Sequence, residues 1–221
     1  MAVLLAGCGA QEAAAPPSSP SPTSSSVSVP DQWNQLAARA EKTYVPKDAF
    51  LPDAPWNRDH PATPGGYEDT TQEVSTVCGG LKISSGFKVS RNRLWRGEHT
   101  VVWQDVHALS ADKAAMVVEQ IQAKARSCAT YARTAGKPER AVTPDVAVTP
   151  PTGFDGFYAF CETATDIKPG QLNCQALLAR GDLLVGFGSN VVSDDPAHAQ
   201  ATALRQLHRM MPVVAQALAA V

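Results

Sequence analysis

The stretch from Leu172 to Gly188 reads LNCQALLARGDLLVGFG, and it decides the fold class. Two apolar runs flank the polar turn Arg180-Gly181-Asp182, and so short a connection is typical of an antiparallel hairpin. The aromatic-rich run Phe154–Glu162 precedes this pair and predicts a third strand. We therefore expect an antiparallel sheet at the centre of the domain.

Helical patterns surround these strands. Apolar residues recur with a helical period over residues 31–44, 110–133 and from about 193 to the C-terminus. Pro196 falls in the first turn of the last helix, where a missing N–H is harmless, and Pro212 predicts a kink. The remaining patterns predict strands at 73–78, 87–96 and 98–108, and irregular Pro-rich connections at 45–66 and 134–151.

The expected architecture is a single α+β domain over residues 31–221. Its antiparallel β-sheet would carry two long α-helices on one face. The chain of 221 residues is long enough to bury the core of such a domain, and it contains no internal repeat.

The N-terminal segment carries a lipoprotein signal. Leu5-Ala6-Gly7-Cys8 has the pattern of a bacterial lipobox, in which small residues precede the cysteine that is acylated. Only seven residues precede Cys8, fewer than a basic n-region and an apolar h-region need, so we interpret residues 1–8 as a truncated signal segment. The alternative is a chance apolar stretch ending in a buried thiol.

Residues 9–30 predict a tether. From Gln11 to Pro30 there are seven Ser, five Pro and one charged residue, which is too little apolar surface to offset the entropy of ordering. Such a segment would hold the domain clear of a membrane. We therefore predict an extracytoplasmic protein, anchored to the outer face of the cell membrane by a lipid on Cys8.

Four cysteines remain in the domain: Cys78, Cys128, Cys161 and Cys174. An even number in an exported chain predicts two disulfides, for which three pairings exist. Spacing favours Cys161–Cys174 as a local link between neighbouring strands, which leaves Cys78–Cys128. The alternative is a zinc site, but the chain has no C-x-x-C pair.

Composition and motifs exclude several functional classes. A formal net charge of −2 argues against a nucleic-acid-binding domain, which needs a dominant basic surface. No apolar run reaches the roughly 18 residues that a membrane-spanning helix needs. The signatures G-x-S-x-G, H-E-x-x-H, G-x-x-x-x-G-K-[ST] and G-x-G-x-x-G are all absent, so we predict no catalytic residue, no metal and no cofactor.

One basic stretch is a candidate binding surface. Residues 82–97 contain five Lys or Arg and no acidic residue. Arg91, Arg93 and Trp95 alternate along a predicted strand, so they share one of its faces. Two guanidinium groups beside an aromatic ring predict a seat for a carboxylate, a phosphate or a sugar. The alternative is an edge strand protected by charge.

Five features lie between residues 74 and 221. They are Cys78, the helix 111–133 with Cys128 and Tyr131 near its end, the strand 157–161, the strand and turn 174–182, and the closing helix. Together they resemble the extracellular sensor domain of actinobacterial PknH-type serine/threonine kinases and of lipoproteins that carry this domain alone. The resemblance implies two disulfides, a sheet backed by long helices, and a cleft that binds an extracytoplasmic ligand. It supplies no catalytic residue, and without a kinase domain any signalling would need a partner.

These observations predict a lipid-anchored, non-enzymatic, sensor-like binding domain for an envelope-derived or anionic ligand. One alternative is a regulatory lipoprotein that restrains an envelope-stress signalling protein by direct contact. Another is a secreted hydrolase, in which Asp105 with His107, or Ser189 with Asp182, forms a nucleophile–base pair. A ligand receptor predicts a concave site near Arg91, Arg93 and Trp95, and a partner-binding regulator predicts an apolar patch there or on the helices.

Overall fold

The computed structural model describes residues 29–46, 56–64, 73–75, 77–82, 88–96, 99–109, 114–132, 139–164 and 167–221. Cys8 and nearly all of the predicted tether lie outside these residues, so the lipidation prediction stays a prediction.

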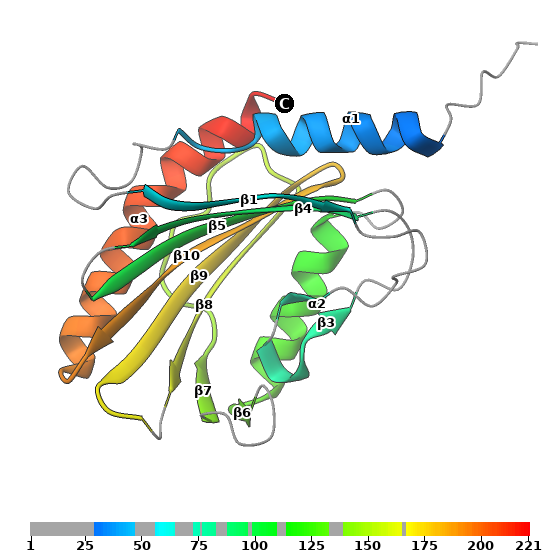
Figure 1. The fold of residues 1–221 in the computed structure, drawn as a ribbon. Coiled ribbons are helices and arrows are strands. Elements are labelled where there is room, and N and C mark those ends of the chain that lie inside the picture. Colours follow the sequence, from blue (N-terminus) through cyan, green and yellow to red (C-terminus); the bar gives the residue numbers. More distant parts are fainter. Residues whose placement is uncertain are drawn as a thin grey trace, which may run out of the picture.

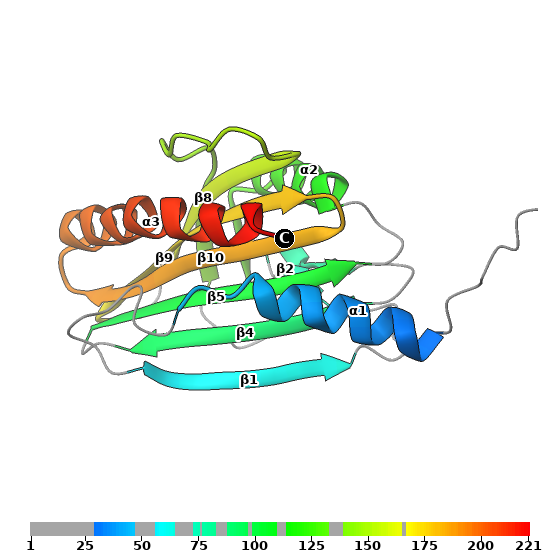
Figure 2. The same ribbon diagram turned by 90° about the horizontal axis from the view of Figure 1, so that it is seen from above.

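An eight-stranded antiparallel sheet forms the centre of the described structure, in the order β1-β4-β5-β10-β9-β8-β7-β6 (Figures 1 and 2). The predicted hairpin lies in the middle of this order, and its pairing runs without a break from Leu183 opposite Arg180 to Ser193 opposite Gly170. A two-stranded sheet, β2 with β3, stands apart from it. The strands are β1 (Trp56–Pro64), β2 (Glu73–Ser75), β3 (Leu81–Lys82), β4 (Lys88–Arg96), β5 (Thr100–Leu109), β6 (Thr130–Ala132), β7 (Glu139–Thr143), β8 (Gly156–Ala164), β9 (Gly170–Arg180) and β10 (Leu183–Ser193).

Helices cover both faces of the large sheet. α1 (Val29–Lys42) and α3 (Pro196–Ala219) lie over one face, and α2 (Ala114–Ser127) packs against the other (Figure 1). The α+β prediction is therefore confirmed, but the two long helices do not share one face. The reason is visible in β9, where Leu178 packs into the α3 core and its neighbour Leu177 into the α2 core. A strand that is apolar on both sides needs cover on both faces.

The structure corrects several boundaries. The second helix ends at Ser127 rather than near residue 133, because Cys128 is bonded to Cys78 and the chain then forms the short strand β6. Strands β1 and β7 occupy parts of the two segments predicted to be irregular. α3 continues through Pro212, whose ring is exposed to solvent.

α3 is held by its apolar stripe. Ala203, Leu207, Met210, Val214 and Leu218 recur every three or four residues and are each 0% exposed. Removing one such side chain, as in Leu207→Ala, costs about 2–5 kcal/mol in cores of this kind. Asp195 fixes the start of the helix, because its carboxylate accepts hydrogen bonds from the backbone N–H groups of the first turn.

The β9–β10 turn joins the sheet to all three helices. Gly181 has φ +60°, the left-handed conformation that the first central residue of a two-residue hairpin turn of type II′ requires. Its carbonyl accepts from the N–H of Ala114, the first residue of α2. Arg180 Nη1 donates to the carbonyl oxygens of Leu218 and Ala219 at 3.3 and 2.5 Å, near the end of α3.

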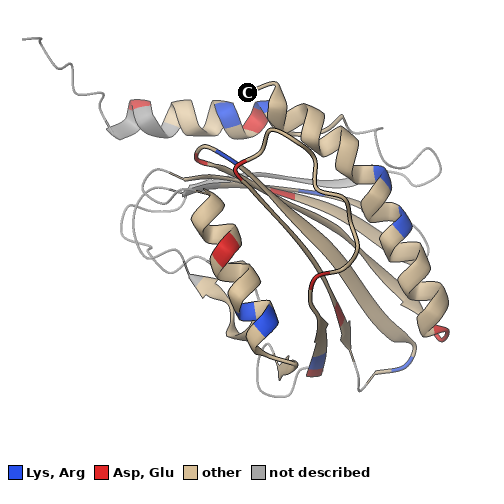
Figure 3. Ribbon diagram, turned by 180° about the vertical axis from the view of Figure 1, so that it is seen from behind, with Lys and Arg blue, Asp and Glu red and all other residues tan. Residues whose placement is uncertain are grey.

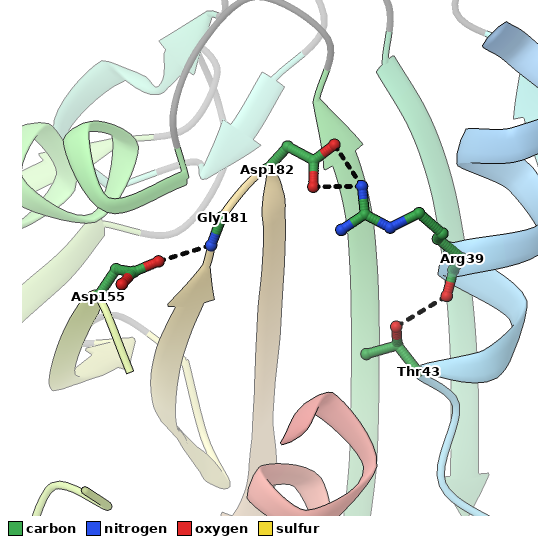
Figure 4. A network of polar contacts seen from close by, with 5 residues as sticks. All are labelled: Arg39, Thr43, Asp155, Gly181 and Asp182. Carbon is green, nitrogen blue, oxygen red and sulfur yellow. Dashed lines mark hydrogen bonds and ion pairs between the residues drawn. The ribbon is translucent and has the colours of Figure 1, made fainter. Parts of the chain in front are cut away.

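The third residue of the turn binds α1. Asp182 lies 2.6 Å from Arg39 Nη1, and the side chain of Asp155 accepts from Gly181 N at 2.6 Å (Figure 4). One short turn therefore fixes the positions of both layers of helices relative to the sheet.

Candidate functional site: a cleft on the sheet

A cleft forms because α2 is shorter than the strands that it covers. Its 14 residues span about 21 Å, whereas the 11 residues of β9 span about 37 Å. The cleft over the uncovered part of the sheet has a volume of about 540 Å³, which is within the usual range for small-molecule sites. The lining residues come from six strands of the large sheet and from β2: Val74, Ser75, Leu94, Val101, Trp103, Asp105, His107, Arg140, Glu162, Asn173, Gln175, Leu177, Gly186 and Asn190.

Strand register explains why these residues share a surface. Asn173 on β9 pairs with Glu162 on β8 and with Asn190 on β10, so three polar side chains form one row across the sheet. Trp103 on β5 pairs with Gly188 in the next row. Because residues two apart on a strand face the same side, both rows open into the cleft.

Glu162 forms the buried polar end of the cleft. Its side chain is 3% exposed, and Oε1 accepts a hydrogen bond from the Tyr131 hydroxyl. Oε2 accepts from Asn173 Nδ2 at 3.4 Å and Gln175 Nε2 at 3.3 Å. Neutral donors therefore hold a buried carboxylate in a fixed orientation, which offsets part of the free energy lost on desolvation.

Trp103 forms the floor of the cleft. Its Nε1 donates to Asn173 Oδ1 at 3.3 Å, which places that edge of the indole over β9. The opposite edge lies at Gly186, where an added Cβ would sit 3.4 Å from Cζ3 and 3.8 Å from Cη2. The indole thus spans from β5 across β10 to β9. Gly186 has no side chain to compete with the ring for this space.

A second polar group lies on β4 and β5. Asn92 donates to Asp105, and Ser90 Oγ lies 2.9 Å from His107 Nδ1. The predicted pair Asp105 and His107 therefore does share the cleft. In the other predicted pair, Ser189 is 0% exposed and donates to Ala203 O, while Asp182 binds Arg39, so the structure does not bring those two together.

Two of the three predicted binding residues on β4, Arg93 and Trp95, lie on the opposite face of the sheet. Trp95 is 0% exposed and Arg93 is 8% exposed, both beneath α1. Arg93 donates to the Val45 carbonyl oxygen, and its guanidinium carbon lies 4.4 Å from the ring centroid of Tyr44. The side chain of Arg91 lies outside the described residues. Because two of the three predicted residues are packed inside the protein, we place the candidate site in the cleft.

Sequence reasoning missed the cleft residues Glu162, Asn173, Gln175 and Trp103. The available signal was the presence of polar side chains in strands that are otherwise apolar. Such residues need hydrogen-bond partners when they are buried, so they predict a polar network inside the protein.

Both disulfides pair as the spacing favoured: Cys78 with Cys128, and Cys161 with Cys174. The first links η1 (Val77–Gly79) to the end of α2 and so holds neighbouring β2, which contributes Val74 and Ser75 to the cleft wall. Two disulfides indicate an oxidising compartment outside the cytoplasm.

Within the described part of the chain, no helix is long and apolar enough to cross a bilayer, and no group of three metal-ligating side chains converges. Acidic and basic residues are mixed along α1 and α2 (Figure 3).

No protein-family model matches the sequence, and no curated protein matches it.

Proposed function

We propose that this chain is a lipid-anchored extracytoplasmic binding domain that holds a small polar ligand in the cleft and performs no reaction on it. The observation that carries the proposal is the buried network around Glu162, where Tyr131, Asn173 and Gln175 orient one carboxylate at the end of a concave site. Polar groups fixed before binding lose little entropy when a ligand arrives, which favours recognition.

The charges in the cleft favour a polar ligand over an anionic one. Asp105 and Glu162 contribute two carboxylates, against the single guanidinium of Arg140. An anion would therefore meet like charges close by. We propose an envelope-derived polar ligand, in keeping with the compartment that the disulfides indicate and with the resemblance to sensor domains.

The anchor at Cys8 is tested separately. When the full chain is expressed behind a complete export signal, Cys8→Ala should move the protein from the membrane fraction to the soluble fraction and remove the lipid mass. Continued lipid attachment in this variant would contradict the anchoring proposal. Cys8→Ala leaves the cleft untouched, so ligand binding should be unchanged.

Binding in the cleft is tested with the full chain and a panel of defined classes: neutral saccharides, amino acids, polyamines, nucleosides and organic acids. At least one class should raise the midpoint of thermal unfolding. Glu162→Gln should remove that rise, because it changes the buried group that fixes the network. The matched control is Arg205→Ala, an exposed position on α3 remote from the cleft lining. A panel without any stabilising class would overturn the binding proposal.

Contact with a signalling protein is the weaker candidate. Met116, at 50% exposure, is the single large hydrophobic side chain exposed among the described residues. Surfaces that dock proteins expose larger apolar patches.

Hydrolysis is the second candidate function, because Ser90 and His107 lie within hydrogen-bond distance at the cleft. Our proposal predicts no turnover of ester, amide or glycoside substrates. Turnover that Ser90→Ala abolishes, with unfolding unchanged, would replace the binding function by a hydrolase.

A further inference from the structure

We propose that the ligand of the cleft is a neutral saccharide whose ring packs on Trp103; this inference rests on the binding function proposed above. Three properties of the cleft point to this ligand class. The floor is aromatic, one amide oxygen in the wall has no hydrogen-bond partner among the described residues, and the carboxylates already accept hydrogen bonds from neutral side chains.

Trp103 supplies a platform. One edge of its indole is fixed to Asn173 by the Nε1 hydrogen bond, and the opposite edge lies at Gly186. Because two opposite edges contact two strands of the sheet, the long axis of the indole runs along the sheet, and our proposal takes one ring face to be turned toward the cleft. The side chain is half-buried and lines the cleft. The face of an aromatic ring carries partial negative charge, so it attracts the weakly positive C–H groups on one side of a sugar ring.

Hydroxyl groups fit the polar atoms around this platform. Asn190 Oδ1 is buried without a hydrogen-bond partner among the described residues. The amide can turn about its broad terminal torsion to present this oxygen to a ligand hydroxyl. Glu162 accepts three hydrogen bonds, and a carboxylate has about four acceptor positions, so one remains for a second hydroxyl.

Charge separates a saccharide from the other polar classes. Neutral side chains already satisfy Glu162, and Asn92 donates to Asp105, so neither carboxylate depends on a cationic ligand. Arg140 at the same cleft offsets part of their negative charge. A sugar carries many hydroxyls and no charge, and each hydroxyl both donates and accepts. The volume of about 540 Å³ suits a small saccharide.

The test uses the full chain with glucose, galactose, mannose, N-acetylglucosamine, maltose, cellobiose, lactose and chitobiose, measured by calorimetry and saturation-transfer NMR. We expect at least one to bind and its C–H protons on one ring face to receive most saturation. Trp103→Ala should weaken binding about tenfold or more, the loss typical of a buried anchor residue, and Trp103→Phe should weaken it less. Asn190→Ala should also weaken it, and Arg205→Ala should not.

Three results would overturn the inference. Saccharide binding that both Trp103 variants leave unchanged would show that the sugar does not pack on Trp103. Binding of polyamines, nucleosides or amino acids, with no saccharide bound at 10 mM, would exclude the saccharide class and leave the proposed binding function standing. Failure of every class would overturn both. Midpoints of thermal unfolding within a few degrees of the unmodified protein establish that each variant is folded.

Discussion

Cys161 and Cys174 are bonded directly across β8 and β9, and the residues beside them, Glu162 and Asn173, pair on the opposite side of the same two strands. Adjacent residues in a strand face opposite sides of the sheet. The disulfide therefore lies in the core beneath α3, behind the polar end of the cleft. It fixes the spacing of the two backbones that carry the Glu162 network.

Removing this disulfide with Cys161→Ala/Cys174→Ala should lower the free energy of unfolding by about 3 kcal/mol, because the bond closes a short loop of 13 residues. Removing Cys78–Cys128, which closes 50 residues, should cost about 4 kcal/mol in the same chain-entropy estimate. Urea denaturation of both variants checks the order. A larger loss for the shorter loop would mean that native contacts, and not the unfolded chain, dominate.

Gly188→Ala should be strongly destabilising. An added Cβ would lie 2.4 Å from the carbonyl oxygen of Cys174 and 3.0 Å from two carbon atoms of Gln175, so backbone on β9 would have to move. We expect the free energy of unfolding, measured by urea denaturation, to fall by about 1–3 kcal/mol, the usual range for overpacked sites.

Gly186→Ala is the matched control on the same strand. Its nearest contacts would be the side chains of Leu177 and Trp103, both at 3.4 Å, which is ordinary van der Waals distance. The free energy of unfolding should change by no more than about 1 kcal/mol. Equal losses for the two variants would contradict the close approach of β9 at Gly188.

The ion pair between Arg39 and Asp182 should contribute modestly to stability. The two side chains are 40% and 33% exposed, so water screens their attraction. A double-mutant cycle with Arg39→Met and Asp182→Asn should give a coupling of about 0.2–1 kcal/mol, as for other solvent-exposed pairs. A coupling of zero would mean that the turn holds α1 through packing alone.

The sequence predicted the sheet because local signals suffice for it. Leu172–Arg180 and Leu183–Gly188 are apolar runs on either side of a two-residue turn, and Pro196 marks the start of α3. The pairing of the four domain cysteines also followed from spacing. These elements depend on residues close together in the chain.

The cleft could not be predicted in this way, because it depends on which residues meet across strands far apart in sequence. Trp103 reaches Asn173 only after β10 has been placed between their strands. The same limit explains why the binding surface predicted on the basic stretch, residues 82–97, is buried. The alternation of side chains along β4 correctly placed Arg93 and Trp95 on one face, but only the position of α1 decides that this face is buried. Likewise β1 has no clear strand pattern and forms by pairing with β4.

The ion pair between Arg126, at the end of α2, and Asp145 should make the stability of the protein depend on pH. Arg126 holds Asp145 by three hydrogen bonds of 2.8–3.0 Å, and this contact lowers the pKa of the Asp145 carboxyl from its ordinary value. A carboxyl whose pKa is lower in the folded state stabilises the protein above its unfolded pKa, near 3.8. That contribution should disappear as the pH falls through the lower, folded-state value.

Asp145→Asn isolates this effect, because Asp145 has φ +55° and Asn tolerates that conformation as well as Asp does. Urea denaturation should show Asp145→Asn to be less stable than the unmodified protein at pH 7, with the difference shrinking as the pH falls below about 3.8 and disappearing once the Asp145 carboxyl of the folded protein is protonated. Asp145→Ala should add a loss that persists at acid pH, because alanine disfavours the left-handed backbone. If the difference for Asp145→Asn were the same at pH 7 and pH 2.5, the carboxylate would not be the source of the stabilisation.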